Sequence, residues 1–99
     1  MEYTSTRNTK KTFSFEEVFL KGLAHDGGLF VPKKIHTYSS EELEKLRNFS
    51  YNRLAADIIS KFCGNTFDHN ELEDLINSSY KQFRTKNVVE IKKLKKQIY

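Results

Sequence analysis

The residue types that most often perform chemistry in proteins are few and scattered in this sequence. His25, His36 and His69 lie far apart, and no carboxylate or cysteine stands at metal-ligand spacing from them. We therefore expect surface or turn histidines and no metal site. Cys63, the single cysteine, falls near the carboxyl end of an expected helix, where a reactive thiolate is disfavoured. We interpret Cys63 as a small buried hydrophobic residue.

The stretch GLAHDGGLFVP, residues 22–32, contains three of the four glycines and the only proline. A phosphate-binding loop would need G-x-x-x-x-G-K-[ST] or G-x-G-x-x-G between a strand and a following helix. Neither pattern is present, and the expected order here is helix and then strand. We therefore predict a structural turn, in which two glycines adopt positive φ and an aspartate bonds forward to backbone amides. The residues of this turn motif are Gly22, Asp26, Gly27, Gly28 and Pro32.

Short elements on either side must position this turn. Ser14 followed three residues later by Glu17 is a capping box, which predicts a helix over residues 15–23. Residues 2–6 are rich in β-formers and predict a strand before the polar stretch RNTKKT. Residues 29–31 predict a second strand, which we expect Pro32 to end.

Three further helices follow from capping signals and apolar spacing. Ser39 with Glu42 predicts a short helix, Ser50 caps a third that Gly64 ends, and Asp68 begins a fourth. Two apolar stripes, which we expect to pack together, comprise Tyr51, Leu54, Ala55, Ile58, Ile59 and Phe62, and Leu72, Leu75, Ile76, Tyr80 and Phe83. The predicted fold class is α+β, mainly α: a small domain of about four helices with strands near 2–6 and 29–31.

Length and composition set limits on function. The 99 residues suit one small domain with one core, and no apolar run approaches the roughly 18 residues of a membrane span. A lone cysteine gives no sign of an oxidising compartment. We therefore expect a cytoplasmic protein without membrane contact.

Positive charge is concentrated at the carboxyl end. Residues 81–99 hold seven Lys and Arg side chains and one Glu, within a formal net charge of +4. KKLKK, residues 92–96, suits either a solvated face or a contact with nucleic acid or another anionic partner. The aromatic residues that single-strand binders use for stacking are missing until Tyr99, which favours the solvated face. The segment 86–99 fits a helix and strand ends equally well.

Several motifs, in order along the chain, resemble the amino-terminal domain of threonine synthase. They are Tyr3, Ser5–Thr6–Arg7, SFEEVFLKGLAHDGGLFVP, SYNRLAADIISKFCG and ELEDLINSSYKQF. The most specific are Y-x-S-T-R and G-L-A-x-D-G-G-L-[FY]-V-P. The resemblance implies a pyridoxal phosphate (PLP) enzyme, a carbon–oxygen lyase that converts O-phospho-L-homoserine and water into L-threonine and phosphate.

The family's cofactor motifs are missing from this sequence. The F-K-D lysine motif and the E-L-F-H-G-P-T-like strand do not occur, so the resemblance implies a fragment. We expect residues 1–85 to form the amino-terminal-like domain and residues 86–99 to begin the connection into a catalytic domain. The fragment alone should be an inactive scaffold without catalytic residues or bound cofactor, and its partner should be the catalytic domain, which binds the small-molecule substrate.

Two residues of the first strand suggest a contact with that catalytic domain. Thr6 and Arg7 lie where the strand meets a loop, and the arginine could pair with a phosphate or with a carboxylate of the missing domain. The competing hypothesis is a stand-alone helical binding module that uses its basic tail. That hypothesis leaves the glycine-rich stretch unexplained.

Overall fold

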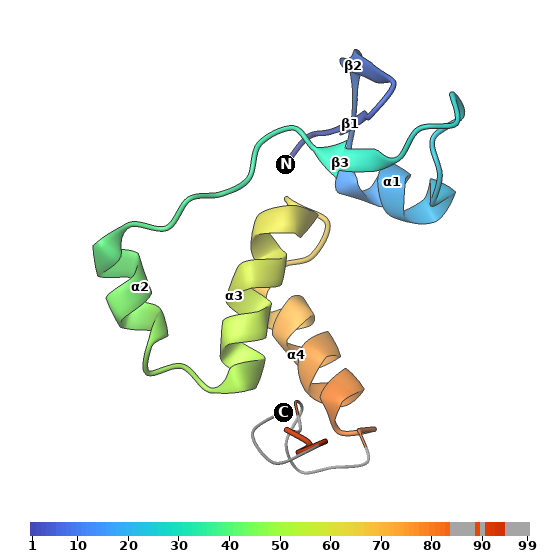
Figure 1. Ribbon diagram of the computed structural model, residues 1–99. Helices are drawn as coiled ribbons and strands as arrows, with labels where there is room; N and C mark the ends of the chain where they lie inside the picture. Colours follow the sequence, from blue (N-terminus) through green and yellow to red (C-terminus); the bar gives the residue numbers. More distant parts are fainter. Residues whose placement is uncertain (84–88, 90, 95–99) are drawn as a thin grey trace.

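The computed structural model describes residues 1–83, 89 and 91–94. Seven elements follow one another in these residues (Figure 1). They are β1 (Tyr3–Ser5), β2 (Asn8–Phe13), α1 (Phe15–Lys21), β3 (Phe30–Pro32), α2 (Ser40–Leu46), α3 (Tyr51–Cys63) and α4 (His69–Tyr80). The predicted α+β class with four helices is confirmed. The expected domain boundary at residue 85 and most of the segment 86–99 lie outside the described residues.

The three strands form an antiparallel sheet in the order β2-β1-β3. The central strand, β1, has all three of its residues buried, whereas the edge strand β2 is exposed along most of its length. No strand was predicted in the polar stretch RNTKKT, residues 7–12, and this was wrong, because β2 covers most of it. An edge strand with both faces near water needs no alternation of apolar and polar residues, so the sequence of β2 carries no pattern that predicts a strand.

Pro32 is also placed differently from the prediction. It is the last residue of β3 and pairs with Tyr3, rather than ending the strand before it. Because β3 is an edge strand, a residue without an N–H group is tolerated there.

The helices begin at the predicted caps. Ser14 and Ser39 each form the reciprocal capping box with the glutamate three residues on. Ser50 and Asp68 accept a backbone N–H bond at the start of α3 and α4. Helix α1 ends at Lys21, two residues earlier than predicted, because Gly22 adopts φ 75° and leaves the helical conformation.

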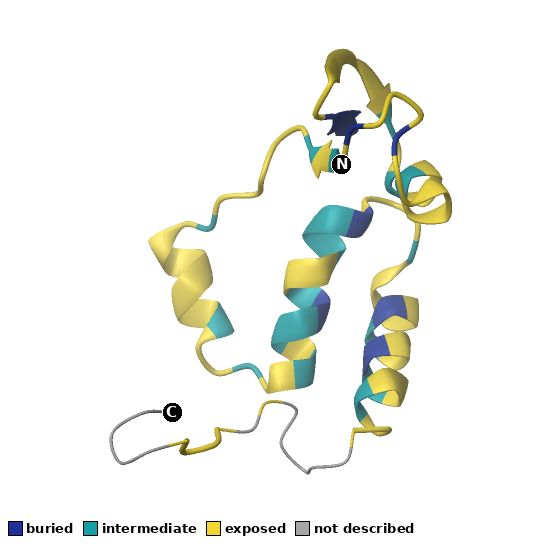
Figure 2. Ribbon diagram, turned by 45° about the vertical axis from the view of Figure 1, so that its right-hand side comes forward, coloured by how far each residue is buried: buried dark blue, intermediate teal, exposed yellow. Residues whose placement is uncertain are grey.

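The apolar core lies between α3 and α4, the two helices that were expected to pack together. The stripe predicted for α3 was partly wrong, because its members Tyr51, Ile58 and Ile59 are exposed and the buried residue, Ala56, was not assigned to it. Ala56, Leu72 and Ile76 are buried, and Ala55, Phe67 and Tyr80 pack around them. Figure 2 shows these buried positions on the facing sides of the two helices. Leu75 and Phe83, assigned to the same stripe, are about half exposed, so the packed stripe of α4 is narrower than predicted.

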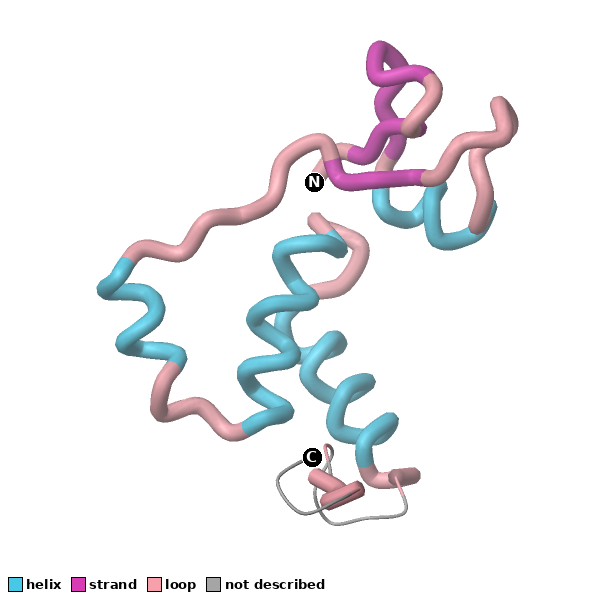
Figure 3. Tube along the Cα trace, in the orientation of Figure 1, coloured by secondary structure: helices cyan, strands magenta, loops and turns pink. Residues whose placement is uncertain are grey.

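Few contacts join the sheet to the helical pair. The Tyr3 hydroxyl donates a hydrogen bond to the Phe62 carbonyl at 2.6 Å, near the end of α3. From β3 the chain runs through a loop, residues 33–39, before α2 begins (Figure 3). No helix in the described part of the chain is long and apolar enough to cross a membrane.

Candidate functional site

The glycine-rich turn is bound to the end of β1 through the side chain of Asp26. Ser5 Oγ donates to Asp26 Oδ1 at 2.7 Å, and the Gly28 amide donates to the same oxygen at 2.9 Å. These two bonds, first that from Ser5, hold the pKa of the Asp26 carboxyl below its usual value. Asp26 therefore bonds forward to a backbone amide, as predicted, and also across 21 residues to β1.

Thr6 and Arg7 complete this set of contacts. The Thr6 amide donates to the Leu29 carbonyl at 2.8 Å, and Thr6 Oγ1 accepts from the Leu29 amide at 3.0 Å. Arg7 donates through its amide to Ser5 Oγ at 3.2 Å and through Nη1 to the Asp26 carbonyl at 3.1 Å. We call the contacts among Ser5, Thr6, Arg7, Asp26, Gly28 and Leu29 the loop clamp.

Both glycines of the D-G-G triplet are required, for different reasons. Gly27 adopts φ 81°, the left-handed conformation that was predicted, and the Arg7 guanidinium lies against it. Gly28 does not have positive φ, so that part of the prediction was wrong. A Cβ at Gly28 would collide with Ser5 Oγ and lie 2.9 Å from Thr6 Oγ1. Close packing against β1, rather than backbone conformation, excludes a larger residue there.

A small hollow of about 200 Å³ lies beside the loop clamp, lined by side chains that include Lys11, His25 and Asp26. A larger and more open hollow of about 880 Å³ lies between residues 33–37 and Lys61. We regard the smaller hollow as the better candidate because polar side chains converge beside it. Arg7 does not line this hollow, but it is exposed and bonds to the Asp26 carbonyl, and its guanidinium is suited to binding a carboxylate or a phosphate.

The histidines do not form a site in the described residues. His36 Nε2 lies 3.7 Å from Glu42 Oε2, and His69 Nε2 lies 3.6 Å from Glu73 Oε2, in surface pairs. His25 lies in the glycine-rich turn. No group of three or more metal-ligating side chains is found among the residues that the structure describes.

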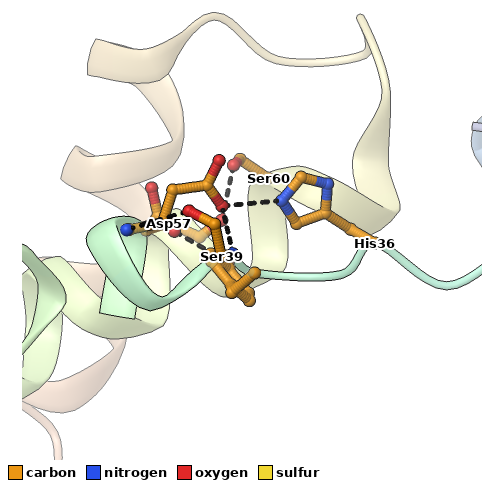
Figure 4. A network of polar contacts seen from close by, with 6 residues as sticks. His36, Ser39, Asp57 and Ser60 are labelled. Atoms are coloured by element: carbon orange, nitrogen blue, oxygen red, sulfur yellow. Dashed lines mark hydrogen bonds and ion pairs between the residues drawn. The ribbon is translucent and has the colours of Figure 1, made fainter. Parts of the chain in front are cut away.

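A polar network that the sequence analysis missed links the chain before α2 to α3 (Figure 4). The Tyr38 hydroxyl donates to Asp57 Oδ2 at 2.8 Å, and burial with this bond raises the pKa of Tyr38 to about 12. The Ser60 hydroxyl donates to the Asp57 carbonyl at 2.6 Å. The Tyr38 bond joins the residues just before α2 to α3, so this network helps to position α2.

Cys63 is buried, as predicted, and burial raises the pKa of its thiol. A thiol with a raised pKa is a poor nucleophile at neutral pH. In the basic tail, Lys92, Lys93 and Leu94 are exposed, and Lys95 and Lys96 lie outside the described part of the chain.

Comparison with known proteins gives one consistent result. A model of the family described as the threonine synthase N terminus matches residues 2–80. The chain is 38% identical over 96 residues to threonine synthase of Schizosaccharomyces pombe and 35% identical over 96 residues to threonine synthase-like 2 of Mus musculus, covering 96% of this chain in each case. The crystal structure of PLP-bound threonine synthase from Brucella melitensis is similar, with a TM-score of 0.84 and 30% identity over 94% of this chain. The chain spans about a fifth of the length of these relatives.

Proposed function

The chain belongs to the threonine synthase family, and we propose that it is the amino-terminal domain of a longer polypeptide that synthesises threonine. The observation that supports this most is the match over residues 2–80, which includes the complete loop clamp. The proposed reaction converts O-phospho-L-homoserine and water into L-threonine and phosphate. Bound PLP would supply an electron sink for carbanions formed on the substrate.

The residues described here do not fit a PLP site. Such a site needs a lysine in a pocket that surrounds the cofactor and excludes water. Among the described lysines, Lys61 is half-buried and the others are exposed. We therefore derive no step through the cofactor and assign its binding to other parts of the full-length polypeptide. The domain itself acts as a scaffold and is inactive alone.

Within this function, we assign Thr6 and Arg7 to the contact with the catalytic domain. Thr6 is exposed and already bonded to Leu29, so it positions the loop. The Arg7 guanidinium has five N–H groups, and its hydrogen bond within the described residues goes to the Asp26 carbonyl. The remaining N–H groups suit a carboxylate of the catalytic domain.

Arg7→Ala in the full-length enzyme tests this assignment, with Arg7→Lys as the conservative control. We expect kcat and KM to be retained and the midpoint of thermal unfolding to fall further in the full-length enzyme than in the 99-residue chain. The bond from Arg7 to the Asp26 carbonyl is lost in both, whereas the interdomain contact is lost only in the full-length enzyme. A raised KM at unchanged stability would contradict the assignment and place Arg7 at the substrate phosphate instead.

The proposed activity itself is tested with the purified full-length protein. Supplied with PLP and O-phospho-L-homoserine, it should release phosphate and threonine in equal amounts, whereas the 99-residue chain should release neither. Phosphate release without threonine would show a related enzyme with a different product. No turnover by a folded, PLP-loaded protein would refute the proposal.

We also propose that the protein acts in the cytoplasm. The single cysteine, which is buried and unpaired, supports a reducing compartment. Fractionation of cells that express the full-length protein, with a membrane marker and a secreted marker, tests this assignment.

A further inference from the structure

Helix α1 presents apolar side chains to the protein and also to water. On its inner side, the half-buried Phe15 ring lies 6.3 Å from the Tyr3 ring. The Phe19 ring stacks on Phe15 at 5.9 Å, yet Phe19 is 72% exposed. Leu20 is 75% exposed, and Leu23 in the following turn is 69% exposed. Figure 2 shows no buried residue on this helix. A surface helix usually has an apolar stripe of about 100° opposite a polar face. Phe15, Val18 and Phe19 fall within one such stripe, whereas Leu20 lies outside it, beyond Glu16.

Phe19, Leu20 and Leu23 form what we call the outer α1 face. Phe19 and Leu20 lie in the last turn of α1, and Leu23 follows two residues after the helix ends at Lys21, so the three exposed side chains are close together along the chain. Together they expose on the order of 400 Å² if a large side chain exposes about 200 Å². The outward positions of α2 differ, because they are mostly Glu and Lys, with Leu43 as the apolar exception.

The size of the outer α1 face favours a covering segment of the same polypeptide. A stable complex between separate chains usually buries roughly 800 Å² on each partner, which is about twice this area. A tethered domain has an effective concentration in the millimolar range, so a smaller contact is sufficient. The matched relatives are about five times longer than this chain, which spans 19% of the Schizosaccharomyces pombe protein and 20% of the Mus musculus protein.

We infer that the outer α1 face is the docking surface for the catalytic domain of the same polypeptide. This inference rests on the proposed function, because it requires the longer chain. It assigns Phe19, Leu20 and Leu23 an interdomain role separate from that of the loop clamp. The covering surface must be apolar, since three large apolar side chains lose water contact there.

Thiol labelling of the full-length protein tests the inference. Leu20→Cys and Leu23→Cys place a thiol on the outer α1 face, and Lys45→Cys places one on the charged exposed side of α2 as the matched control. Each variant is treated with a maleimide, and labelling at that site is measured by peptide mass spectrometry. The same variants are made in the 99-residue chain. Buried Cys63 reports on unfolding in every sample.

We expect residues 20 and 23 to label at least about tenfold more slowly in the full-length protein than in the 99-residue chain, because a docked surface opens only rarely. Residue 45 should label at equal rates in both. Equal rates at residues 20 and 23, or equal protection at residue 45, would overturn the inference. Protection of the 99-residue chain that increases with its concentration would instead identify a second copy as the covering partner and also overturn it.

Two further measurements keep the test independent of variant folding and of the proposed function. If Cys63 labels rapidly in a variant, hydrogen exchange of the unsubstituted proteins replaces labelling, and the amides of residues 19–21 should exchange more slowly in the full-length protein. Threonine formation is assayed separately. Protection without threonine formation supports the docking surface and refutes the activity. Threonine formation without protection supports the activity and overturns the docking surface.

Discussion

Substitution of Gly28 by alanine should destabilise the domain because a Cβ has no room there. The added methyl group would collide with Ser5 Oγ and lie 2.9 Å from Thr6 Oγ1 and 3.0 Å from Asp26 Oδ1. All three atoms belong to the loop clamp, so none can move without lengthening a hydrogen bond. Overpacking of this kind costs about 1–3 kcal/mol, and we expect a loss of about 2 kcal/mol.

The assay is urea unfolding of the 99-residue chain followed by circular dichroism. Gly22→Ala is the matched control, because a Cβ at Gly22 meets nothing within 4 Å and only its φ of 75° is unfavourable. It should cost about 1 kcal/mol. In thermal unfolding, the loss of about 2 kcal/mol expected for Gly28→Ala corresponds to an unfolding midpoint lower by about 8–16 °C for a domain of this size.

A double-mutant cycle separates the collision from other causes. Ser5→Ala removes the atom that the new Cβ meets first, so Ser5→Ala/Gly28→Ala should cost less than the sum of the single changes by about 1 kcal/mol. The reasoning would be refuted if Gly28→Ala cost no more than Gly22→Ala, or if the two changes in the cycle were additive.

Three further predictions concern the caps, the clamp carboxylate and the α3 network. Ser39→Ala removes the capping box of α2 and should cost about 1 kcal/mol in urea unfolding, whereas Ser40→Ala, at the next position, should cost little. The pKa of the Asp26 carboxyl is lowered in the folded state, so the ionised carboxylate adds to the free energy of unfolding above the unfolded pKa near 4. This added stability is lost as pH falls through the folded pKa. Asp26→Asn should therefore remove this part of the acid dependence of stability, measured between pH 2 and 6. The pKa of Tyr38 is raised to about 12, so the neutral hydroxyl adds fully to the free energy of unfolding below about pH 10 and adds less as pH rises toward 12. Tyr38→Phe should flatten this alkaline decline in stability. An unchanged profile would show that the hydroxyl bond to Asp57 contributes nothing to stability.

The parts of the fold that were predictable are those that nearby residues determine. A capping box needs only residues three apart, so the starts of α1 and α2 followed from Ser14 and Ser39. That α3 packs on α4 followed from apolar spacing, but Ala56, the α3 residue buried against α4, was not in the predicted stripe. The edge strand β2 was missed because its exposed Asn, Thr and Lys residues carry no burial pattern, and only pairing with β1 makes it a strand.

The candidate site was predictable in its residues but not in its contacts. Asp26 and the glycines were singled out as a turn, and Thr6 and Arg7 as a separate feature. Their meeting depends on β3 pairing with β1, which no local pattern specifies. The need for a glycine at position 28 was missed in the same way, because the atoms that exclude a Cβ there come from β1 and the residue after it.

The position of β1 has a consequence for folding on the ribosome. Its residues leave the ribosome before those of the later elements, yet the Tyr3 hydroxyl bonds to the carbonyl of Phe62, which is 59 residues later. At roughly 5–20 residues per second, Tyr3 waits about 3–12 s for this partner. During that interval the β1–β2 hairpin can form, but one side of β1 stays unpaired until β3 is made. Lys10 and Lys11 on β2 are charged and exposed, and they protect the other edge of the early hairpin from pairing with neighbouring nascent chains.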